Sequence, residues 1–377
     1  MISEKDLIEV RNRDFLKNKN HFRDFDNIKT NYLFGYKVEN AYLTVIVPYY
    51  DHPVEFAKRA LNSVLNQYCD FEIQILIIDE KANDQNSNYF LEYVKRLNDP
   101  RIICYQNEHS LGVFANWNRA IELADSKWIT ILHTDDFYKD NYLQNMKKIL
   151  DENPQIDQLA CNYKMLNFLK DKIDVEKEFQ GKSSDSTVRK VHYTEYFYDM
   201  VTSVKGSIYK KDKLIALGGF RSQGDGIGLD DYPLMLRFAY YYNTYLLENV
   251  LYLDSWGYND SLNLRHWYPE LVENYYMWLY FAKKETGLIR KLYLNRAKYL
   301  LGYRAVQYNN GTSWIGVPVP IDFNQLAIDC QLNDLNVDIV RKKMNGICIK
   351  IVQMIKKKGM VKYSVNITAF KGKYKLK

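Results

Sequence analysis

Cysteine and proline are both scarce in this chain, which has 5 cysteines and 8 prolines among 377 residues. The cysteines stand far apart in the sequence, with no CxxC pair, at Cys69, Cys104, Cys161, Cys330 and Cys348. This spacing does not suit a disulfide framework or a zinc site, so we expect a protein of a reducing cytosol. With so little proline and 47% apolar residues, the composition indicates a globular protein and excludes a disordered one.

Long hydrophobic runs are also missing. No stretch approaches the ~18 consecutive apolar residues that a membrane-spanning helix needs. The first residues, MISEKDLIEVRNRDF, are charged throughout and lack the apolar centre of a signal peptide. We therefore expect a cytoplasmic protein without a membrane-spanning segment.

Acidic residues are absent from the end of the chain, where residues 341–377 hold 12 Lys or Arg and no Asp or Glu. Because the net charge of the whole chain is +6, subtracting these 12 positive charges leaves −6 for residues 1–340. A basic tail on an acidic body is typical of proteins that contact nucleic acid or an anionic membrane surface.

The segment MNGICIKIVQMIKKK (344–358) is amphipathic when wound as a helix, with Lys350, Lys356 and Lys357 opposite its apolar side. This layout is typical of a helix that lies in a membrane interface. The interleaved aromatic residues of a nucleic-acid platform are few here. We therefore expect residues 341–377 to bind an anionic membrane surface, at the inner face of the plasma membrane, and we expect no nucleic-acid partner. The alternative is a helix packed on the body with a solvated lysine end. The sequence predicts no oligomeric state.

Short apolar runs alternate with amphipathic segments from Leu43 onward. The runs LTVIVPYY, IQILIID, IICYQ and WITIL are rich in β-branched residues, and residues 54–67, 84–98 and 113–124 between them have helical spacing. Alternating strands and helices predict an α/β fold with a parallel sheet covered on both faces. Further strands are expected in residues 156–163 and 244–253, and two aromatic-rich helices in residues 269–308.

Polar residues follow three of these strands, in VIVPYYD, ILIIDEK and ITILHTDDF. In open sheets of this kind, ligands bind beyond the carboxyl ends of the strands. The three strands therefore predict a site of acidic and aromatic side chains at one edge of the sheet.

Asp135 and Asp136 are adjacent carboxylates, whose like charges need either water or a cation between them. One interpretation is that an aspartate caps a helix over FYKDNYLQNMKKIL. The other is a divalent cation, Mn²⁺ or Mg²⁺, bound by carboxylate oxygen together with the phosphates of a nucleotide. His133 is a weaker candidate ligand, because a histidine at a strand end is as often packed.

Four segments give these acids a context: LTVIVPYYDHPVEFAKRALNSVLNQ, FEIQILIIDEKANDQ, NEHSLGVFANWNRAIELADSKWITILHTDDF and GLDDYPLMLRFA. In this order, over residues 41–260, they resemble glycosyltransferase family 2. The resemblance implies a GT-A fold, with a Rossmann-like, mixed and mostly parallel sheet flanked by helices, and inverting transfer from a nucleotide-sugar. It divides the chain into an N-terminal extension (1–40), a GT-A catalytic domain (41–262, its nucleotide-sugar half ending near residue 140), a helical extension (263–340) and the basic tail (341–377).

The resemblance also assigns roles in binding the nucleotide-sugar. Pro48, Tyr49, Tyr50 and Asp51 match the first-strand stretch that lies against the base and ribose. Asp79 matches the second-strand aspartate that accepts a hydrogen bond from the uracil ring.

The next matching segments lie closer to the diphosphate. Asn116, Asn118 and Arg119 match the segment that closes over the base and diphosphate. HTDD matches the metal motif, usually Asp-x-Asp, with His133 in the first position. The resemblance then implies Asp135 as the preferred metal ligand and Asp136 as the second, with Thr134 beside the donor.

Asp230 and Asp231 match the family's acidic pair near the acceptor, and Asp231 takes the position of the general base. Inverting transfer needs such a base, because the acceptor hydroxyl must lose its proton as its oxygen attacks the sugar. An aspartate at its ordinary pKa of ~3.9 is a weak base, so we expect partial burial to raise the pKa of Asp231. The pair also suits a helix N-terminus before YPLMLRFAYYY, and both interpretations can hold together.

The sequence therefore predicts a metal-dependent inverting glycosyltransferase of bacterial surface-glycan assembly. We expect it to move a sugar from a nucleotide-sugar, with UDP the expected nucleotide, to a glycan or lipid-linked acceptor in capsule, exopolysaccharide or lipooligosaccharide synthesis. One alternative is a sugar nucleotidyltransferase, which would need a glycine-rich basic loop where this chain has VPYYDHP. Another is a non-catalytic nucleotide-sugar-binding module, which would not need a base such as Asp231.

Overall fold

The computed structural model describes residues 2–17, 19–81, 85–168, 173–179, 187–197, 201–221, 230–256, 264–313, 316–333 and 335. The tail predicted to bind membranes, residues 341–377, lies outside this part of the chain. No helix in the described part is long and apolar enough to cross a membrane.

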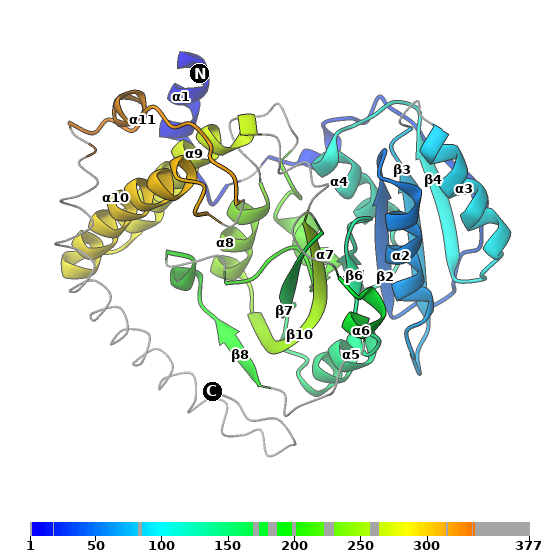
Figure 1. Ribbon diagram of the computed structural model, residues 1–377. Coiled ribbons are helices and arrows are strands. Elements are labelled where there is room, and N and C mark those ends of the chain that lie inside the picture. Colours follow the sequence, from blue (N-terminus) through cyan, green and yellow to red (C-terminus); the bar gives the residue numbers. More distant parts are fainter. Residues whose placement is uncertain are drawn as a thin grey trace.

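One mixed sheet organises the chain, with strand order β1-β4-β3-β2-β5-β9-β7-β10-β6 and β8 paired to β10 (Figure 1). Its strands are β1 (Thr30–Gly35), β2 (Leu43–Tyr49), β3 (Ile73–Asp79), β4 (Ile102–Asn107), β5 (Trp128–Ile131), β6 (Phe137–Tyr138), β7 (Gln158–Asn167), β8 (Val188–Val191), β9 (Ser207–Lys210) and β10 (Thr244–Trp256). The strands β4, β3, β2 and β5 run parallel to one another, as do β7 and β10. The antiparallel strand β9 joins these two parallel groups.

Helices cover both faces of the sheet, which explains why the parallel strands are apolar along their whole length. The helices are α1 (Glu4–Asn12), α2 (Val54–Leu65), α3 (Gln85–Leu97), α4 (Val113–Leu123), α5 (Tyr142–Glu152), α6 (Val175–Phe179), α7 (Lys211–Ala216), α8 (Asp231–Tyr241), α9 (Trp267–Lys284), α10 (Gly287–Asn309) and α11 (Phe323–Asp329), with short 3₁₀ turns at His21–Arg23, Tyr193–Phe197 and Leu264–His266. Val45 and Val47 of β2 pack in one core with α2, α3 and α5. Ile46 between them packs in the opposite core with α4, α8 and α9. The predicted α/β fold with a GT-A-like mixed sheet is thus confirmed.

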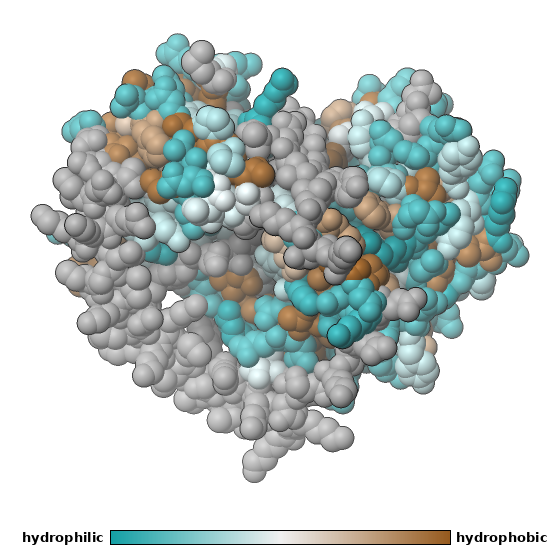
Figure 2. All heavy atoms as spheres, viewed as in Figure 1, coloured by the Kyte–Doolittle hydropathy of each residue, from teal (hydrophilic) through white to brown (hydrophobic). Residues whose placement is uncertain are grey.

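The helices α9 and α10 form a hairpin beside the sheet, near α1 and α11 (Figure 1). Trp267 and Trp278 of α9 are fully buried. Both ends of the described chain meet at one side of the molecule, since Arg11 of α1 donates a hydrogen bond to the carbonyl of Asp329, the last residue of α11. On the face shown in Figure 2, hydrophobic residues over α2 and α3 are scattered among hydrophilic ones.

Two parts of the chain differ from what the sequence pattern suggests. The helix expected directly after Asp136 begins only at Tyr142, with Asn141 at its N-cap. Phe137 and Tyr138 form β6 instead, because they pair with Leu253 and Tyr252 of β10. The interpretation of Asp135 or Asp136 as the cap of that helix is therefore wrong. In the N-terminal extension, β1 adds an antiparallel edge strand beside β4.

Candidate active site

The carboxyl ends of β3, β2 and β5 lie side by side at one edge of the sheet. Tyr49, the last residue of β2, is opposite Asp79, the last residue of β3. Ile46 of β2 is opposite Ile131 of β5, and the 133–136 loop follows directly. The predicted convergence of polar strand ends therefore occurs, since the three strands are parallel neighbours.

The 133–136 loop gathers three groups that can bind a metal. Ligand atoms of His133, Asp135 and Asp136 all lie within 4.8 Å of one another. The His133 ring packs against the Trp117 ring with 5.0 Å between centroids, and its Nδ1 is 3.6 Å from Asp136 Oδ2. Its Nε2 is buried without a hydrogen-bond partner. Burial lowers the pKa of His133 well below its usual value, and the nearby charge of Lys205 adds to this effect, which favours the neutral imidazole that metals bind.

Asp136 is fully buried and already anchored to β10. Its carboxylate accepts hydrogen bonds from the Tyr252 hydroxyl at 2.8 Å and the Ser255 N–H at 2.7 Å. Burial raises the pKa of Asp136 well above its ordinary value, although Lys205 opposes the shift. Asp136 therefore joins the loop to the far half of the sheet.

Lys205 is a cation at this site that no local sequence pattern marks. Its ammonium lies 3.3 Å from Asp136 and 2.5 Å from Asp254. Burial by itself would lower the pKa of Lys205, but the carboxylates of Asp136, Asp254 and Asp135 raise it instead. Lys205 is therefore protonated at neutral pH and offsets part of the negative charge of the cluster.

Arg59 of α2 is a second cation missing from the predicted site. Its Nη2 donates to the carbonyl of Asp135 at 2.9 Å and to the Ser255 hydroxyl at 3.1 Å. The guanidinium sits among the rings of Phe56, Phe137 and Phe168, at 4.8, 4.7 and 4.7 Å from their centroids. In the sequence it is one polar position of an amphipathic helix, so no local signal marks it.

Asp79 ends β3 as a fully buried carboxylate. It accepts hydrogen bonds from the Ser87 hydroxyl at 3.0 Å and from Gln106 Nε2 at 2.7 Å. Burial raises the pKa of Asp79, which these two donors partly counteract. The next residue, Glu80, accepts the N–H groups of Leu111 and Gly112 at 2.9 and 3.3 Å and so holds the loop before α4.

At the end of β2, one tyrosine is buried and the next is exposed. Tyr49 is fully buried and stacks on Phe90 with 4.6 Å between centroids, while its hydroxyl donates to the His52 carbonyl at 2.7 Å. Tyr50, after Pro48 and Tyr49, is 55% exposed. Asp51 has a left-handed backbone with φ of 40°. The turn therefore presents Tyr50 and Asp51 to solvent and keeps Tyr49 in the core.

The predicted residues of α4 hold other segments in place. Asn118 exchanges two hydrogen bonds with the backbone of Phe220, at 2.7 and 2.9 Å. Asn116 accepts from Asn107 at 2.9 Å. The Arg119 guanidinium binds the N-terminal extension through the carbonyls of Phe25 and Ile28 and the Thr30 hydroxyl, at 2.8, 2.9 and 2.7 Å.

Thr134 and the glycine beside Phe220 show how closely these segments pack. The Thr134 hydroxyl is hydrogen-bonded to His52 Nδ1 at 2.6 Å, which ties the 133–136 loop to the turn after β2. Gly219 has φ of +74°, and a Cβ there would lie 2.5 Å from Asn118 Oδ1. Only glycine meets both conditions without strain.

Asp230 and Asp231 begin α8, as the sequence pattern predicted. Asp230 is the N-cap residue, and its Oδ2 accepts the Arg221 N–H at 2.8 Å and Arg237 Nη2 at 3.2 Å, while its Oδ1 is buried without a hydrogen-bond partner. Asp231 Oδ1 accepts the Tyr232 N–H at 2.8 Å. Burial raises the pKa of Asp231, Asp230 adds to the shift, and Lys205 opposes it. Lys205 thus acts electrostatically on Asp231 as well as on Asp135 and Asp136.

The backbone N–H of Arg221 connects Asp230 to a cluster of ion pairs around Glu273. Glu273 of α9 accepts from the Arg221 guanidinium, with Nη2 to Oε2 at 3.0 Å. It also pairs with Arg13, which follows α1. Glu273, Arg221 and Arg13 carry no motif in the sequence, because their partners are distant along the chain.

Comparison with known proteins agrees with this geometry. Residues 44–191 match the family model described as glycosyl transferase family 2, which stops short of Asp230 and Asp231. The uncharacterized glycosyltransferase MJ1057 of Methanocaldococcus jannaschii is 27% identical over 180 residues, which are 48% of this chain and 59% of that protein. The putative colanic acid biosynthesis glycosyl transferase WcaA of Escherichia coli is 33% identical over 105 residues, 28% of this chain and 36% of that protein. The chain thus spans less than two thirds of the length of these relatives.

Among solved structures, S. aureus TarS residues 1–349 superimpose with a TM-score of 0.51 at 17% sequence identity. The match covers 76% of this chain and 78% of that one. This likeness supports the GT-A arrangement of the sheet and helices.

Proposed function

We propose that this chain, which belongs through residues 44–191 to glycosyl transferase family 2, is a metal-dependent inverting glycosyltransferase. The observation that carries the proposal is the cluster at the carboxyl end of β5, where ligand atoms of His133, Asp135 and Asp136 lie within 4.8 Å of one another. Burial raises the pKa of the candidate base Asp231, and the opposing effect of Lys205, which pairs with Asp136, supports a position for Asp231 near this cluster.

The residues of the 133–136 loop fit a divalent cation. Carboxylate oxygen suits both Mn²⁺ and Mg²⁺. The Nε2 atom of His133 is buried without a hydrogen-bond partner, and a bound metal ion would offset the free-energy cost of burying this polar atom. Asp135 is the preferred ligand, with Asp136 and His133 within reach. When bound, the metal would neutralise charge on the departing nucleoside diphosphate.

The protein's own groups supply the remaining requirements. Arg59 fixes the backbone of Asp135, and Lys205 keeps positive charge beside the cluster. Asp231 takes the proton from the acceptor hydroxyl as that oxygen attacks the anomeric carbon opposite the nucleoside diphosphate. Its raised pKa makes it a stronger base than an ordinary aspartate, and the Tyr232 N–H orients its carboxylate.

The proposed donor is a UDP-sugar, with Asp79, Tyr50, Asp51, Asn116, Asn118 and Thr134 around it. Pro48 and Tyr49 shape the end of β2, and Arg119 acts through the N-terminal extension that it holds. The proposed acceptor is a glycan or lipid-linked glycan of surface-polysaccharide synthesis, which the similarity to the putative colanic acid biosynthesis glycosyl transferase WcaA supports. A peripheral position on the inner face of the plasma membrane is proposed from the basic sequence 341–377 alone.

The test is turnover with a panel of nucleotide-sugars and Mn²⁺, read as acceptor-dependent release of nucleoside diphosphate. Asp135→Ala and Asp231→Asn should each lower kcat by roughly 10²–10⁴-fold. Asp212→Asn is a matched control, because the Asp212 side chain is 68% exposed on α7. Near-normal transfer by Asp231→Asn would refute the base assignment. Donor binding without any turnover would favour the non-catalytic module.

A further inference from the structure

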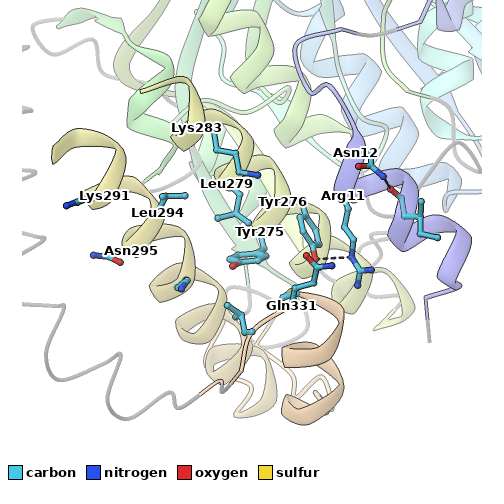
Figure 3. A pocket seen from close by; sticks show the side chains of 14 residues that line it. Arg11, Asn12, Tyr275, Tyr276, Leu279, Lys283, Lys291, Leu294, Asn295 and Gln331 are labelled. Atoms are coloured by element: carbon cyan, nitrogen blue, oxygen red, sulfur yellow. Dashed lines mark hydrogen bonds between the residues drawn. The ribbon is translucent and has the colours of Figure 1, made fainter. Parts of the chain in front are cut away.

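A cavity of about 760 Å³ lies between α1, α9, α10 and the segment after α11, apart from the candidate active site (Figure 3). Its lining residues are Ile8, Arg11, Asn12, Tyr275, Tyr276, Leu279, Lys283, Lys291, Leu294, Asn295, Lys298, Cys330, Gln331 and Leu332. None of them belongs to the site at the strand ends. The volume lies within the range of roughly 300–1,000 Å³ typical of small-ligand pockets.

The lining of this pocket is strongly cationic. It contains Arg11, Lys283, Lys291 and Lys298 and no carboxylate side chain. Within the described residues, no carboxylate is recorded within 4.0 Å of the ammonium groups of the three lysines. This is unexpected in a body whose residues 1–340 carry a net charge of −6. The three lysine side chains therefore place positive charge at the pocket that no ion pair within the described residues neutralises.

The arrangement of the cations follows from helix geometry. Lys291, Leu294, Asn295 and Lys298 are spaced at i, i+3, i+4 and i+7, so they share one face of α10. Lys283 of α9 and Lys291 of α10 also line the pocket, from the two helices of the hairpin (Figure 3). Arg11 of α1 is fixed by hydrogen bonds to the Tyr276 hydroxyl at 3.1 Å and the Asp329 carbonyl at 3.0 Å.

The wall between these cations is amphipathic. Tyr275 and Tyr276 are 2% and 7% exposed, and Leu279 and Leu294 lie beside them. Rings and aliphatic groups of this kind can pack against a sugar ring or an alkyl chain, while Asn295 offers an amide for hydrogen bonding. The pocket therefore combines cationic side chains that can bind an anion with an apolar wall that can contact the uncharged part of the same ligand.

We propose that this pocket is a second ligand site, which binds a phosphate-bearing molecule with its phosphate on Lys283, Lys291 and Lys298. Lysine ammonium groups bind phosphate as compact point charges and need no fixed fork geometry. The same chemistry is offered by a soluble sugar phosphate or diphosphate and by the headgroup of a phospholipid. The tyrosine and leucine side chains contact the remainder of either molecule.

Isothermal titration of the full chain with pyrophosphate, in the presence of EDTA, tests the soluble form. EDTA keeps metal-assisted binding at the 133–136 loop out of the measurement. The double variant Lys291→Gln/Lys298→Gln should bind pyrophosphate at least tenfold more weakly. Both side chains are exposed, so the fold should be retained. Lys95→Gln, an exposed lysine on α3, should bind as the natural chain does.

Sedimentation with phosphatidylcholine vesicles, with and without phosphatidylglycerol, tests the lipid form. Loss of phosphatidylglycerol-dependent binding in the double variant, but not in Lys95→Gln, would assign the pocket to a lipid headgroup. The basic residues 341–377 are the same in every variant, so their contribution cancels in this comparison. The proposal is overturned if the natural chain binds neither probe, or if the double variant binds both as well as the natural chain.

Discussion

The two acidic pairs of this protein are held in place in different ways. Asp135 and Asp136 lie on the short loop between β5 and β6, and Asp136 accepts hydrogen bonds directly from Tyr252 and Ser255 of β10. Asp230 and Asp231 begin a helix, and Asp230 depends on Arg221, which depends in turn on Glu273 of α9. The proposed metal end, the 133–136 loop, is thus hydrogen-bonded to the sheet, whereas the proposed base end, Asp230 and Asp231, is linked through Arg221 to ion pairs in the helical part.

This difference predicts which acidic pair a given substitution will affect. A change in the ion pairs around Glu273 should loosen the base end and leave the metal end intact, because the two share no hydrogen bond in the described residues. A change beside the 133–136 loop should weaken the proposed metal end and leave the proposed base end intact. The variants below separate the two ends, beginning with the largest expected effect.

Glu273→Gln should destabilise the protein most. The neutral amide would leave the guanidinium groups of Arg13 and Arg221 facing no carboxylate at this position, which for a buried ion pair costs about 3–5 kcal/mol. Chemical unfolding measures the loss of free energy. Glu55→Gln is the control, because Glu55 is 80% exposed and its pair with Lys58 contributes about 0–1 kcal/mol. Weaker Mn²⁺ binding in Glu273→Gln would contradict the independence of the two ends.

Arg59→Lys should weaken the metal end. Lysine keeps the charge but loses the Nη2 that donates to the Asp135 carbonyl and the Ser255 hydroxyl. Supporting contacts around metal ligands typically contribute about 10–100-fold, so activation by Mn²⁺ should require that much more metal. Titration of activity with Mn²⁺ tests this, with Arg96→Lys as the control at an 80% exposed position. An unchanged Mn²⁺ requirement would show that Arg59 does not position the loop.

The pH profile should report on the base end. Because burial raises the pKa of Asp231, its carboxylate becomes protonated at a pH above the ordinary value of ~3.9. Only the deprotonated form accepts the acceptor proton, so kcat/KM should fall as the pH drops through that raised pKa. The residual activity of Asp231→Asn should lack this acidic limb. If the limb persists unchanged in that variant, another group is the base.

Tyr49→Phe should have the smallest effect. It removes the hydrogen bond from the hydroxyl to the His52 carbonyl, which contributes about 1 kcal/mol of stability, and leaves the stack on Phe90. The donor KM should stay unchanged, because Tyr49 lies in the core. A large rise in donor KM, with stability preserved, would place the hydroxyl against the nucleotide and contradict this assignment.

Much of the sheet between residues 41 and 140 could be predicted from the sequence. β2, β3 and β5, and the polar residues at their ends, follow from local patterns, since a run of β-branched residues buried on both faces forms a strand wherever it lies. The helix beginning at Asp231 follows from a different local pattern, because acidic residues favour a helix N-terminus. The order of the acidic residues along the chain also follows from the sequence alone.

The tertiary structure alone decided which side chains surround those acids. Phe137 and Tyr138 form a strand instead of a helix because β10, more than a hundred residues later, pairs with them. Lys205, Arg59 and Glu273 reach the site from distant segments, and Arg119 binds the N-terminal extension. Periodicity reports only whether a residue is buried or exposed. The partner of a buried charge is set by the packing of segments far apart in the chain, and no local pattern encodes it.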